Sequence, residues 1–159
     1  MYPTVNDLSE KIRVETVRLL NARLADAIDL QTQAKQAHWN VKGPNFIALH
    51  KLFDEVVEAV EDYVDEIAER ARKLGGATLR SVSEITRNQR LRDNDDGRLS
   101  PADMLKELLD DNRQLTRFLR SSHELCDRYR DVATASLLEN WIDEAERRIW
   151  FLAETTRDS

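Results

Sequence analysis

The sequence predicts an all-α protein, and three observations carry that prediction. Its 159 residues include only four glycines and three prolines, so few positions would interrupt a helix. Charged residues make up 34% of the chain, which suits long helices with one solvated face. Apolar residues recur at intervals of three and four along almost the whole sequence, which is the period of an amphipathic helix. These observations predict four long helices packed as a bundle.

The first helix is predicted from about Asp7, its expected N-cap, to Trp39 or Asn40. Gly43-Pro44 then breaks the helical pattern, so the next helix must be a separate element. The apolar stripe of the first helix comprises Val17, Leu20, Leu24 and Ile28.

The second helix is predicted to begin near Asn45 and to end at Gly75-Gly76. Its apolar residues alternate mostly at steps of four and three and form a seam along one side. His50 occupies the one position of this seam that lacks an apolar residue. The seam consists of Phe46, Phe53, Val57, Val60, Val64, Ile67, Ala71 and Leu74.

The third long helix is predicted to open at Ser100-Pro101, which supply an N-cap and a proline at the first helical position. The fourth is predicted from about Val132 to about Thr155. Their apolar stripes are Leu105, Leu108, Leu115, Leu119, Cys126 and Tyr129 in the third, and Leu138, Ile142, Ala145, Ile149 and Leu152 in the fourth.

The connection between the second and third helices, residues 75–99, is too long for a tight antiparallel turn. Within it Leu79, Val82 and Ile85 would share one face of a short extra helix, and the segment RDNDDGRLS is expected to be an exposed loop. The sequence has no internal repeat, linker or low-complexity tract. We therefore predict one domain over residues 1–159, with a short N-terminal tail at about 1–6.

Composition narrows the function classes. The formal net charge of −6 favours attraction of cations and disfavours a surface that wraps phosphates. The single cysteine, Cys126, excludes a disulfide framework and fits a reducing compartment. No apolar run reaches the ~18 residues of a membrane span, and no signal peptide is visible. The expected location is the cytoplasm.

Asp54, Asp65 and Glu69 lie on one side of the second helix, beside the seam. Counted from His50 at about 100° per residue, their directions are about 40°, 60° and 100°. However, Asp54 and Asp65 are ~16 Å apart along the axis, whereas a metal–oxygen bond is about 2 Å long. The stripe therefore holds two half-sites, one with the histidine and Asp54, the other with Asp65 and Glu69. Two copies of this helix, packed antiparallel about a two-fold axis, would join the halves, with His38 on the histidine side.

Two imidazoles with three carboxylates favour a transition metal that accepts nitrogen and oxygen donors, iron first and zinc as the alternative. No Glu-x-x-His segment occurs, so the usual di-iron site inside one carboxylate bundle is not encoded. The competing interpretation is structural. The carboxylates would then belong to a solvated acidic face with Glu58, Glu61 and Asp62, and His50 would be a hydrogen-bonded core residue.

The remaining candidate side chains are interpreted structurally. His123 lacks carboxylates at metal-binding spacing and is expected to be a hydrogen-bonded core or surface residue. Cys126 lies in an apolar stripe and is predicted to be an inert buried thiol. Trp39, Trp141 and Trp150 are expected to be core or interface aromatics.

The segment HWNVKGPNFIALHKLFDEVVEAVEDYVDEIAERARKLGG resembles the signature of the Dps family, DNA-binding proteins from starved cells that are also called miniferritins. The helical layout, the final segment RRIWFLAE and the long connection, which is typical of ferritin-like four-helix bundles, extend the resemblance over the whole chain. It implies a cytoplasmic, hollow homo-dodecamer, with association with the nucleoid as an alternative location. The cage would oxidise Fe(II), preferably with hydrogen peroxide and otherwise with dioxygen, store Fe(III) mineral and so protect DNA.

The resemblance also assigns ligands. His38, His50 and Asp54 match the family's ligands from one subunit, and Asp65 and Glu69 match those from its partner. Each inter-subunit site would bind two iron ions, and zinc could take their place. Asp65, Glu69 and the opposing histidine would hold the tighter iron. His50 and Asp54 would hold the weaker one, with Glu69 able to bridge.

Trp39 matches the family's tryptophan beside the site, and would donate an electron or intercept a radical. Two features depart from the family. Relatives that bind DNA commonly carry a lysine-rich terminal tail, but here no Lys or Arg precedes Lys11 and the final ETTRDS is not basic. Weak or no direct DNA binding is therefore expected. Many relatives have Thr-Ala-Asp where this chain has Thr134-Ala135-Ser136, so no pore residue is assigned.

Two alternative functions remain open at this point. One is a DNA-condensing structural protein of the same family with little ferroxidase activity. The other is a helical scaffold without metal. The intact ligand set favours the ferroxidase, and the missing basic tail counts against the DNA-condensing protein.

Overall fold

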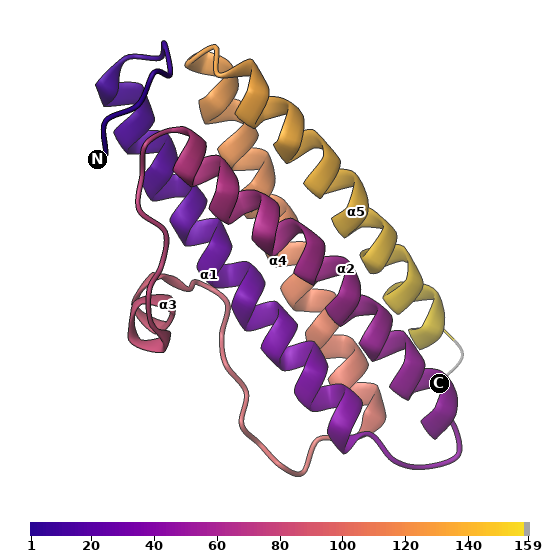
Figure 1. The fold of residues 1–159 in the computed structure, drawn as a ribbon. Coiled ribbons are helices and arrows are strands. Elements are labelled where there is room, and N and C mark those ends of the chain that lie inside the picture. Colours follow the sequence, from indigo (N-terminus) through magenta and orange to yellow (C-terminus); the bar gives the residue numbers. More distant parts are fainter. Residues whose placement is uncertain (158–159) are drawn as a thin grey trace.

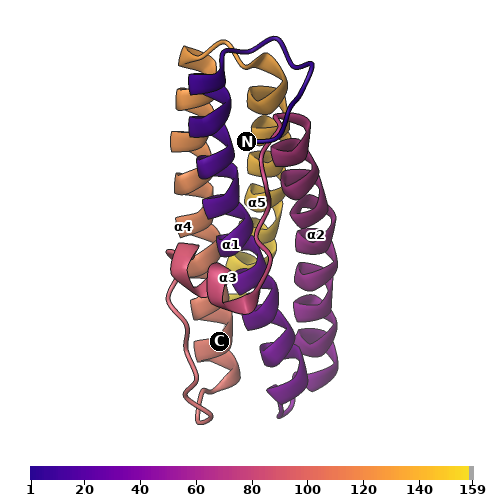
Figure 2. The ribbon, with the colours of Figure 1, turned by 60° about the vertical axis from the view of Figure 1, so that its left-hand side comes forward.

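The computed structural model describes residues 1–157, so Asp158 and Ser159, the end of the predicted domain, lie outside the described residues. The described chain forms four long helices that run alongside one another and a short helix that lies outside α1 (Figure 1, Figure 2). This arrangement confirms the predicted four-helix bundle with a short extra helix. In chain order the elements are α1 (Glu10–Asn40), α2 (Phe46–Lys73), α3 (Val82–Asn88), α4 (Pro101–Arg128) and α5 (Val132–Thr156).

The bundle consists of two helical hairpins. α1 packs along α2 and α4 packs along α5, while the two hairpins meet mainly through α1 and α4. Fully burying one large apolar side chain contributes about 1.5–3 kcal/mol, so the shared core is the main source of stability. None of the described helices is both long and apolar enough to cross a membrane. Fully buried core residues include Leu20, Leu30, Phe53, Ile67, Leu115, Leu119, Leu138 and Leu152.

α1 begins later than the sequence predicts. Its N-cap is Ser9, whose hydroxyl accepts a hydrogen bond from Ile12 N at 3.4 Å, and not Asp7. Just before it, Asn6 Oδ1 accepts from Leu8 N at 3.0 Å and turns the chain. Ser and Asp are comparable N-caps, so the apolar pattern alone could not choose between them.

The buried face of α2 is rotated slightly from the predicted seam. Leu49, Val56 and Tyr63 are buried, whereas Phe46, which belongs to the predicted seam, is 36% exposed. His50 consequently lies at the edge of the buried face and is half-buried. At that edge the imidazole contacts α1 and remains partly exposed to solvent.

The short helix α3 forms where predicted, but its apolar residues do not share one buried face. Ser81 caps it, since its hydroxyl accepts from Glu84 N at 3.2 Å. Leu79 lies before the helix and is half-buried, as is Ile85, whereas Val82 is 78% exposed. The expectation of a shared face is therefore wrong, because the helical spacing does not extend back to Leu79.

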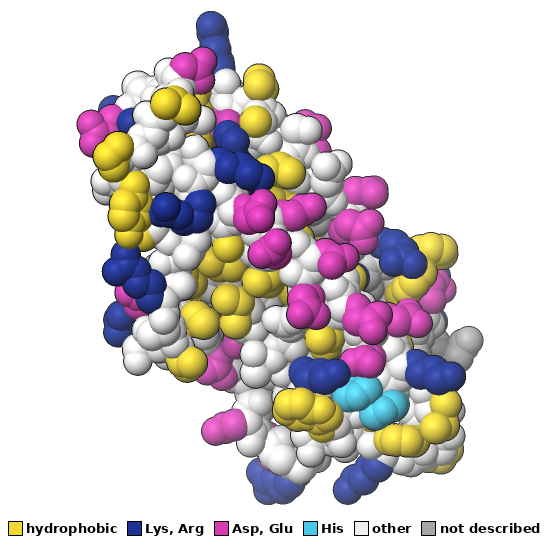
Figure 3. Space-filling view, in the orientation of Figure 1, with side chains coloured by type: hydrophobic (Ala, Val, Ile, Leu, Met, Phe, Trp, Pro, Cys, Tyr) yellow, Lys and Arg dark blue, Asp and Glu magenta, His cyan; other side chains and the backbone are white. Residues whose placement is uncertain are grey.

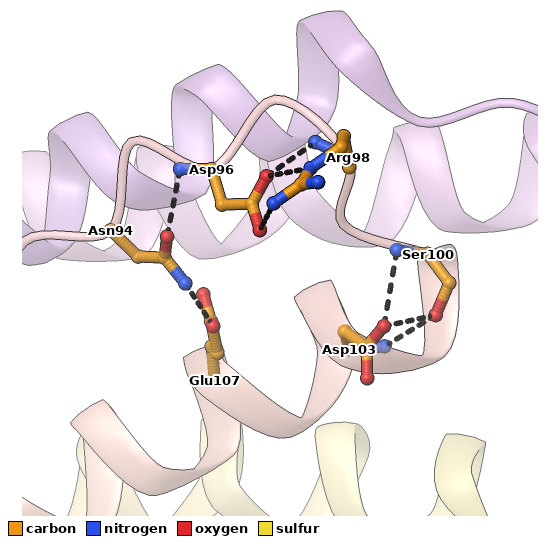
Figure 4. Close-up of polar contacts among 6 residues, drawn as sticks. All are labelled: Asn94, Asp96, Arg98, Ser100, Asp103 and Glu107. Carbon is orange, nitrogen blue, oxygen red and sulfur yellow. Dashed lines mark hydrogen bonds and ion pairs between the residues drawn. The ribbon is translucent and has the colours of Figure 1, made fainter.

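The start of α4 lies where the sequence predicts it, and a capping box stabilises it. Ser100 Oγ accepts from Asp103 N at 3.1 Å, and Asp103 Oδ2 accepts from Ser100 N at 3.2 Å (Figure 4). Nearby, the Asn94 side chain donates to the Glu107 carboxylate. These bonds anchor the end of the long connection on α4.

The N-terminal segment lies against the end of α2. Tyr2 N donates to Gly75 O at 2.6 Å, and the Tyr2 hydroxyl accepts from Arg80 at 3.1 Å. The Arg72 guanidinium lies 4.4 Å from the centre of the Tyr2 ring. Gly75 has a φ of +82°, and a Cβ there would meet Tyr2 O at 2.9 Å, so glycine is required on both counts.

Candidate metal centre

His38 and His50 face each other across the turn between α1 and α2. Their rings are stacked, with centroids 3.7 Å apart and an interplanar angle of 19°. His38 Nδ1 lies 2.7 Å from the backbone oxygen of His50, and His50 Nδ1 lies 2.8 Å from the backbone oxygen of His38. Phe46 packs against His50 with ring centroids 5.0 Å apart. The turn therefore joins two histidines that the sequence separates by twelve positions.

These reciprocal hydrogen bonds determine which ring nitrogen is available. A carbonyl oxygen can only accept, so Nδ1 must carry the hydrogen in both rings. In a neutral imidazole the lone pair is then on Nε2, and an anchored Nδ1–H is the usual arrangement of a metal-binding histidine. The two rings together offer two nitrogen donors whose orientation the chain itself sets.

Asp54 lies one helical turn after His50. Its Oδ1 accepts from Lys35 Nζ at 2.6 Å and lies 3.8 Å from His38 Nδ1. The hydrogen bond from Lys35 lowers the pKa of the Asp54 carboxyl, and the positive charge of Lys35 acts in the same direction. Sequence reasoning missed Lys35, although its position three residues before His38 places both on one face of α1.

Asp65 and Glu69 lie farther along α2 and are exposed. Glu69 Oε2 accepts from Lys73 Nζ at 3.2 Å, across one helical turn, and its side chain is 59% exposed. Within residues 1–157, no group of three or more His, Cys, Asp or Glu side chains has metal-binding geometry. The structure thus brings three of the predicted ligands together and leaves the other two apart.

Acidic side chains form a band along α2 that leads toward the histidines (Figure 3). Part of this band lines a groove of about 660 Å³ between α2 and α5. At its edge Trp141 Nε1 donates to Glu66 Oε2 at 2.6 Å. We call this the acidic groove, and such a surface concentrates cations. Its acidic residues are Glu55, Glu58, Glu61, Asp62, Glu66 and Glu144.

The tryptophans differ in exposure. Trp141 is 2% exposed and belongs to the core, as expected. Trp39, directly after His38, is 68% exposed, and Trp150 is 60% exposed. In the single chain neither of the latter two is covered.

The remaining candidates have structural environments. Cys126 is fully buried, and burial raises the pKa of its thiol to about 12, which leaves it protonated and unreactive. His123 is half-buried, with Nε2 2.9 Å from Glu139 Oε1. Both observations agree with the structural interpretation of these side chains.

Comparison with known proteins assigns this fold to a class. Residues 17–158 match the family described as the ferritin-like domain. The described fold, four long helices with a long connection between α2 and α4, is the one expected of that class.

Individual relatives narrow the class. The chain is 32% identical over 151 residues to the DNA protection during starvation protein of Agrobacterium fabrum, covering 95% of this chain and 93% of that protein. DpsC from Streptomyces coelicolor superposes with a TM-score of 0.94 at 26% identity, covering 100% of this chain and 92% of the other. An archaeal Dps homologue from Halobacterium salinarum gives 0.90 at 27% identity, covering 100% and 91%. The chain therefore belongs to the Dps family of ferritin-like proteins.

Proposed function

We propose that this chain is the subunit of a dodecameric cage that oxidises and stores iron. The observation that carries the proposal is the histidine pair, whose anchored Nδ1 atoms leave both Nε2 atoms as donors beside an ionised Asp54. Family membership supports it. A Dps protein of the same fold from Vibrio cholerae is described as a member of a broad superfamily of ferritin-like diiron-carboxylate proteins. That description agrees with the proposal. By removing Fe(II) and peroxide, the cage would protect DNA.

Each site would take His38, His50 and Asp54 from one subunit, and Asp65 and Glu69 from its partner. The two carboxylates are exposed, and they lie ~16 Å (Asp65) and ~22 Å (Glu69) along α2 from Asp54, too far to reach the same metal within one chain. Antiparallel packing of two α2 helices about a two-fold axis would join the halves and form two sites per pair. The exposed Trp39 would lie beside each site.

The donor set fits iron as the substrate. Two Fe(II) ions give one electron each to hydrogen peroxide, which takes up two protons and leaves as two water molecules. Because both electrons are available at one site, no hydroxyl radical is released. Carboxylates favour the Fe(III) product, and dioxygen would be the alternative oxidant. Zinc suits the same donors but has no redox chemistry, so it would inhibit.

Three residues around the site would have auxiliary roles. Lys35 neutralises Asp54 at 2.6 Å, so it would have to release this carboxylate when Fe(II) binds. Trp39 would donate an electron or intercept a radical, because it adjoins His38 without offering a ligand atom. The acidic groove, represented by Glu58, would attract iron toward mineral growth.

Direct DNA binding would be weak. The N-terminal segment has no Lys or Arg before Lys11, and the bond from Tyr2 N to Gly75 O holds it against the bundle. This segment then offers few phosphate contacts that would release counterions.

The proposal is tested by Fe(II) oxidation with peroxide, followed by absorbance, in protein whose assembly is checked by light scattering. Asp65→Ala with Glu69→Ala should remove nearly all activity, because every site loses two ligands. Glu124→Ala with Asp127→Ala is the matched control, because it removes two exposed carboxylates of α4 outside the acidic groove, and its initial rate should be near normal. Equal rates in both variants, or a wild type that stays monomeric, would contradict the proposal.

A further inference from the structure

A second groove, of about 590 Å³, is lined by residues of α1, α3 and α4, whereas the acidic groove lies between α2 and α5. Four arginines line it, and none of the described residues that line it is Asp or Glu. We call it the arginine groove. A concentration of positive charge is unexpected in a chain with a net charge of −6. Its arginines are Arg18, Arg23, Arg87 and Arg90.

One arginine forms the floor of the groove. Arg23 is 4% exposed, and its Nη2 lies 3.0 Å from Asp26 Oδ2. The other oxygen of Asp26 accepts from Arg90 N at 2.5 Å. The Arg23 and Arg90 guanidinium groups lie 4.5 and 5.6 Å from the centre of the Phe118 ring. Asp26 therefore forms an ion pair with the arginine at the floor of the groove.

The other three arginine side chains lack an ion-pair partner. Among the ion pairs of the described residues, none includes Arg18, Arg87 or Arg90. Burial lowers the pKa of Arg23, Asp26 opposes this, and repulsion from Arg90 adds to it. Mutual repulsion around one hollow is unfavourable unless an anion binds there.

We infer that the arginine groove binds a phosphate-bearing anion through Arg18, Arg87 and Arg90. Planar guanidinium groups donate in pairs to phosphate oxygens, and several of them can surround one tetrahedral anion. Two guanidinium groups lie over the Phe118 ring, so a nucleobase has little ring surface on which to stack. The ligand is therefore recognised through its phosphate alone. The inference does not depend on the proposed iron site.

The phosphate could be a free ion or part of a nucleic-acid backbone. A duplex offers many phosphates, but the groove provides only three arginines without an ion pair, and the net charge of −6 repels a polyanion. Inorganic phosphate is the expected source. A 20-base-pair duplex used as a competitor would separate the two.

The test is calorimetric titration of the full-length protein with inorganic phosphate at low ionic strength. Arg18→Gln with Arg87→Gln removes two exposed, unpaired charges and should preserve the fold. Each lost bond to a charged group is worth about tenfold in affinity or more. The variant should therefore lose at least about tenfold. Arg113→Gln with Arg117→Gln makes the same charge change on α4 outside the groove and should change affinity less than about threefold.

Two outcomes would overturn the inference: no phosphate binding by the wild type, or the same loss of affinity in both variants. Either would show that the arginines are merely solvated. If the duplex displaces phosphate, and the groove variant loses both ligands, the inference holds with nucleic acid as the source. If the duplex does not compete, free phosphate is the ligand.

Discussion

Carboxylates crowd together in two regions of this molecule, and the regions differ in burial. Along α2 they are exposed, as at Asp65 and Glu69. Under the long connection, Asp29 is only 7% exposed, and burial, reinforced by a hydrogen bond and repulsion from Asp93, raises its pKa to about 7. Burial also raises the pKa of the nearby Asp111 to about 7.

The difference shows that the number of acidic residues does not by itself make a cation site. Where burial and repulsion make ionisation costly, carboxyl groups keep protons near neutral pH, and a cation would have to displace them. Where carboxylates face water, they stay charged and can turn toward an ion. The exposed region is thus the one that we propose for iron.

The largest effect is expected in a test of whether two subunits together complete the proposed metal site. One variant has His38→Ala and His50→Ala, and a second has Asp65→Ala and Glu69→Ala, and each alone should be almost inactive. In a mixed two-fold pair, one site collects both lesions while the other keeps every ligand. Random co-assembly makes about half of the pairs mixed, so roughly a quarter of wild-type ferroxidase activity should return.

The co-assembly must start from co-expressed or unfolded chains, so that both variants fold and assemble together. Ferroxidase activity is measured after mass spectrometry has verified that both variants are present in one assembly. No recovery in such assemblies would mean that all ligands come from a single chain, and the two-half geometry would be refuted.

A smaller effect is expected in the buried region. The unfolded chain loses the Asp29 proton near pH 3.8 and the folded chain near pH 7. Between these values the folded state holds more protons, so this group's contribution to stability falls as pH rises. Asp29→Asn has no proton to lose. At pH 8 it should raise the free energy of unfolding by on the order of 1–2 kcal/mol, less than the full shift because Asp93 shares it.

Urea denaturation at pH 5 and pH 8, at one protein concentration, measures this change. Asp62→Asn on α2 is the matched control, and as an exposed position it should alter stability by less than about 0.5 kcal/mol at either pH. If the free energy of unfolding of the Asp29→Asn variant keeps the wild-type pH dependence, the proposed difference between the buried and the exposed carboxylates would be wrong.

The smallest effect on iron binding is expected at Trp39. Trp39→Phe keeps a ring beside His38 and removes no ligand atom, so calorimetric Fe(II) binding should stay near wild type. Damage by radicals during turnover with peroxide, detected as oxidised residues by mass spectrometry, should increase. Lost iron binding would show instead that the indole supports the ligands.

Much of the fold could be predicted because its signals are local. The Ser100-Pro101 start of α4 and the glycines after α2 are readable from neighbouring residues alone. The start of α1 was harder to place because Asp7 and Ser9 are equally good caps. The residue spacing also gave the direction of each α2 side chain around the helix axis. It could not show that the buried face is rotated slightly to one side of the predicted seam.

The details of the site could not be predicted in the same way. Stacking of His38 on His50 and the bond from Lys35 to Asp54 depend on how two helices meet after the turn. The arginine groove draws on three separate elements, and only the folded chain places Arg18 beside Arg87. Sequence patterns show which side chains lie on each face of a helix. Contacts between side chains of different helices can be predicted only when the neighbouring helices are known.

The reciprocal histidine bonds also have a mechanical consequence. Each ring holds the other residue's backbone oxygen, at 2.7 and 2.8 Å, so α1 and α2 are locked in axial register at this point. A slip of one residue would move the helices by about 1.5 Å and stretch both bonds beyond their normal length. The two histidines thus fix the position of α2 along the axis of α1. The exposed carboxylates farther along α2 therefore depend on these two hydrogen bonds for their position along the bundle axis.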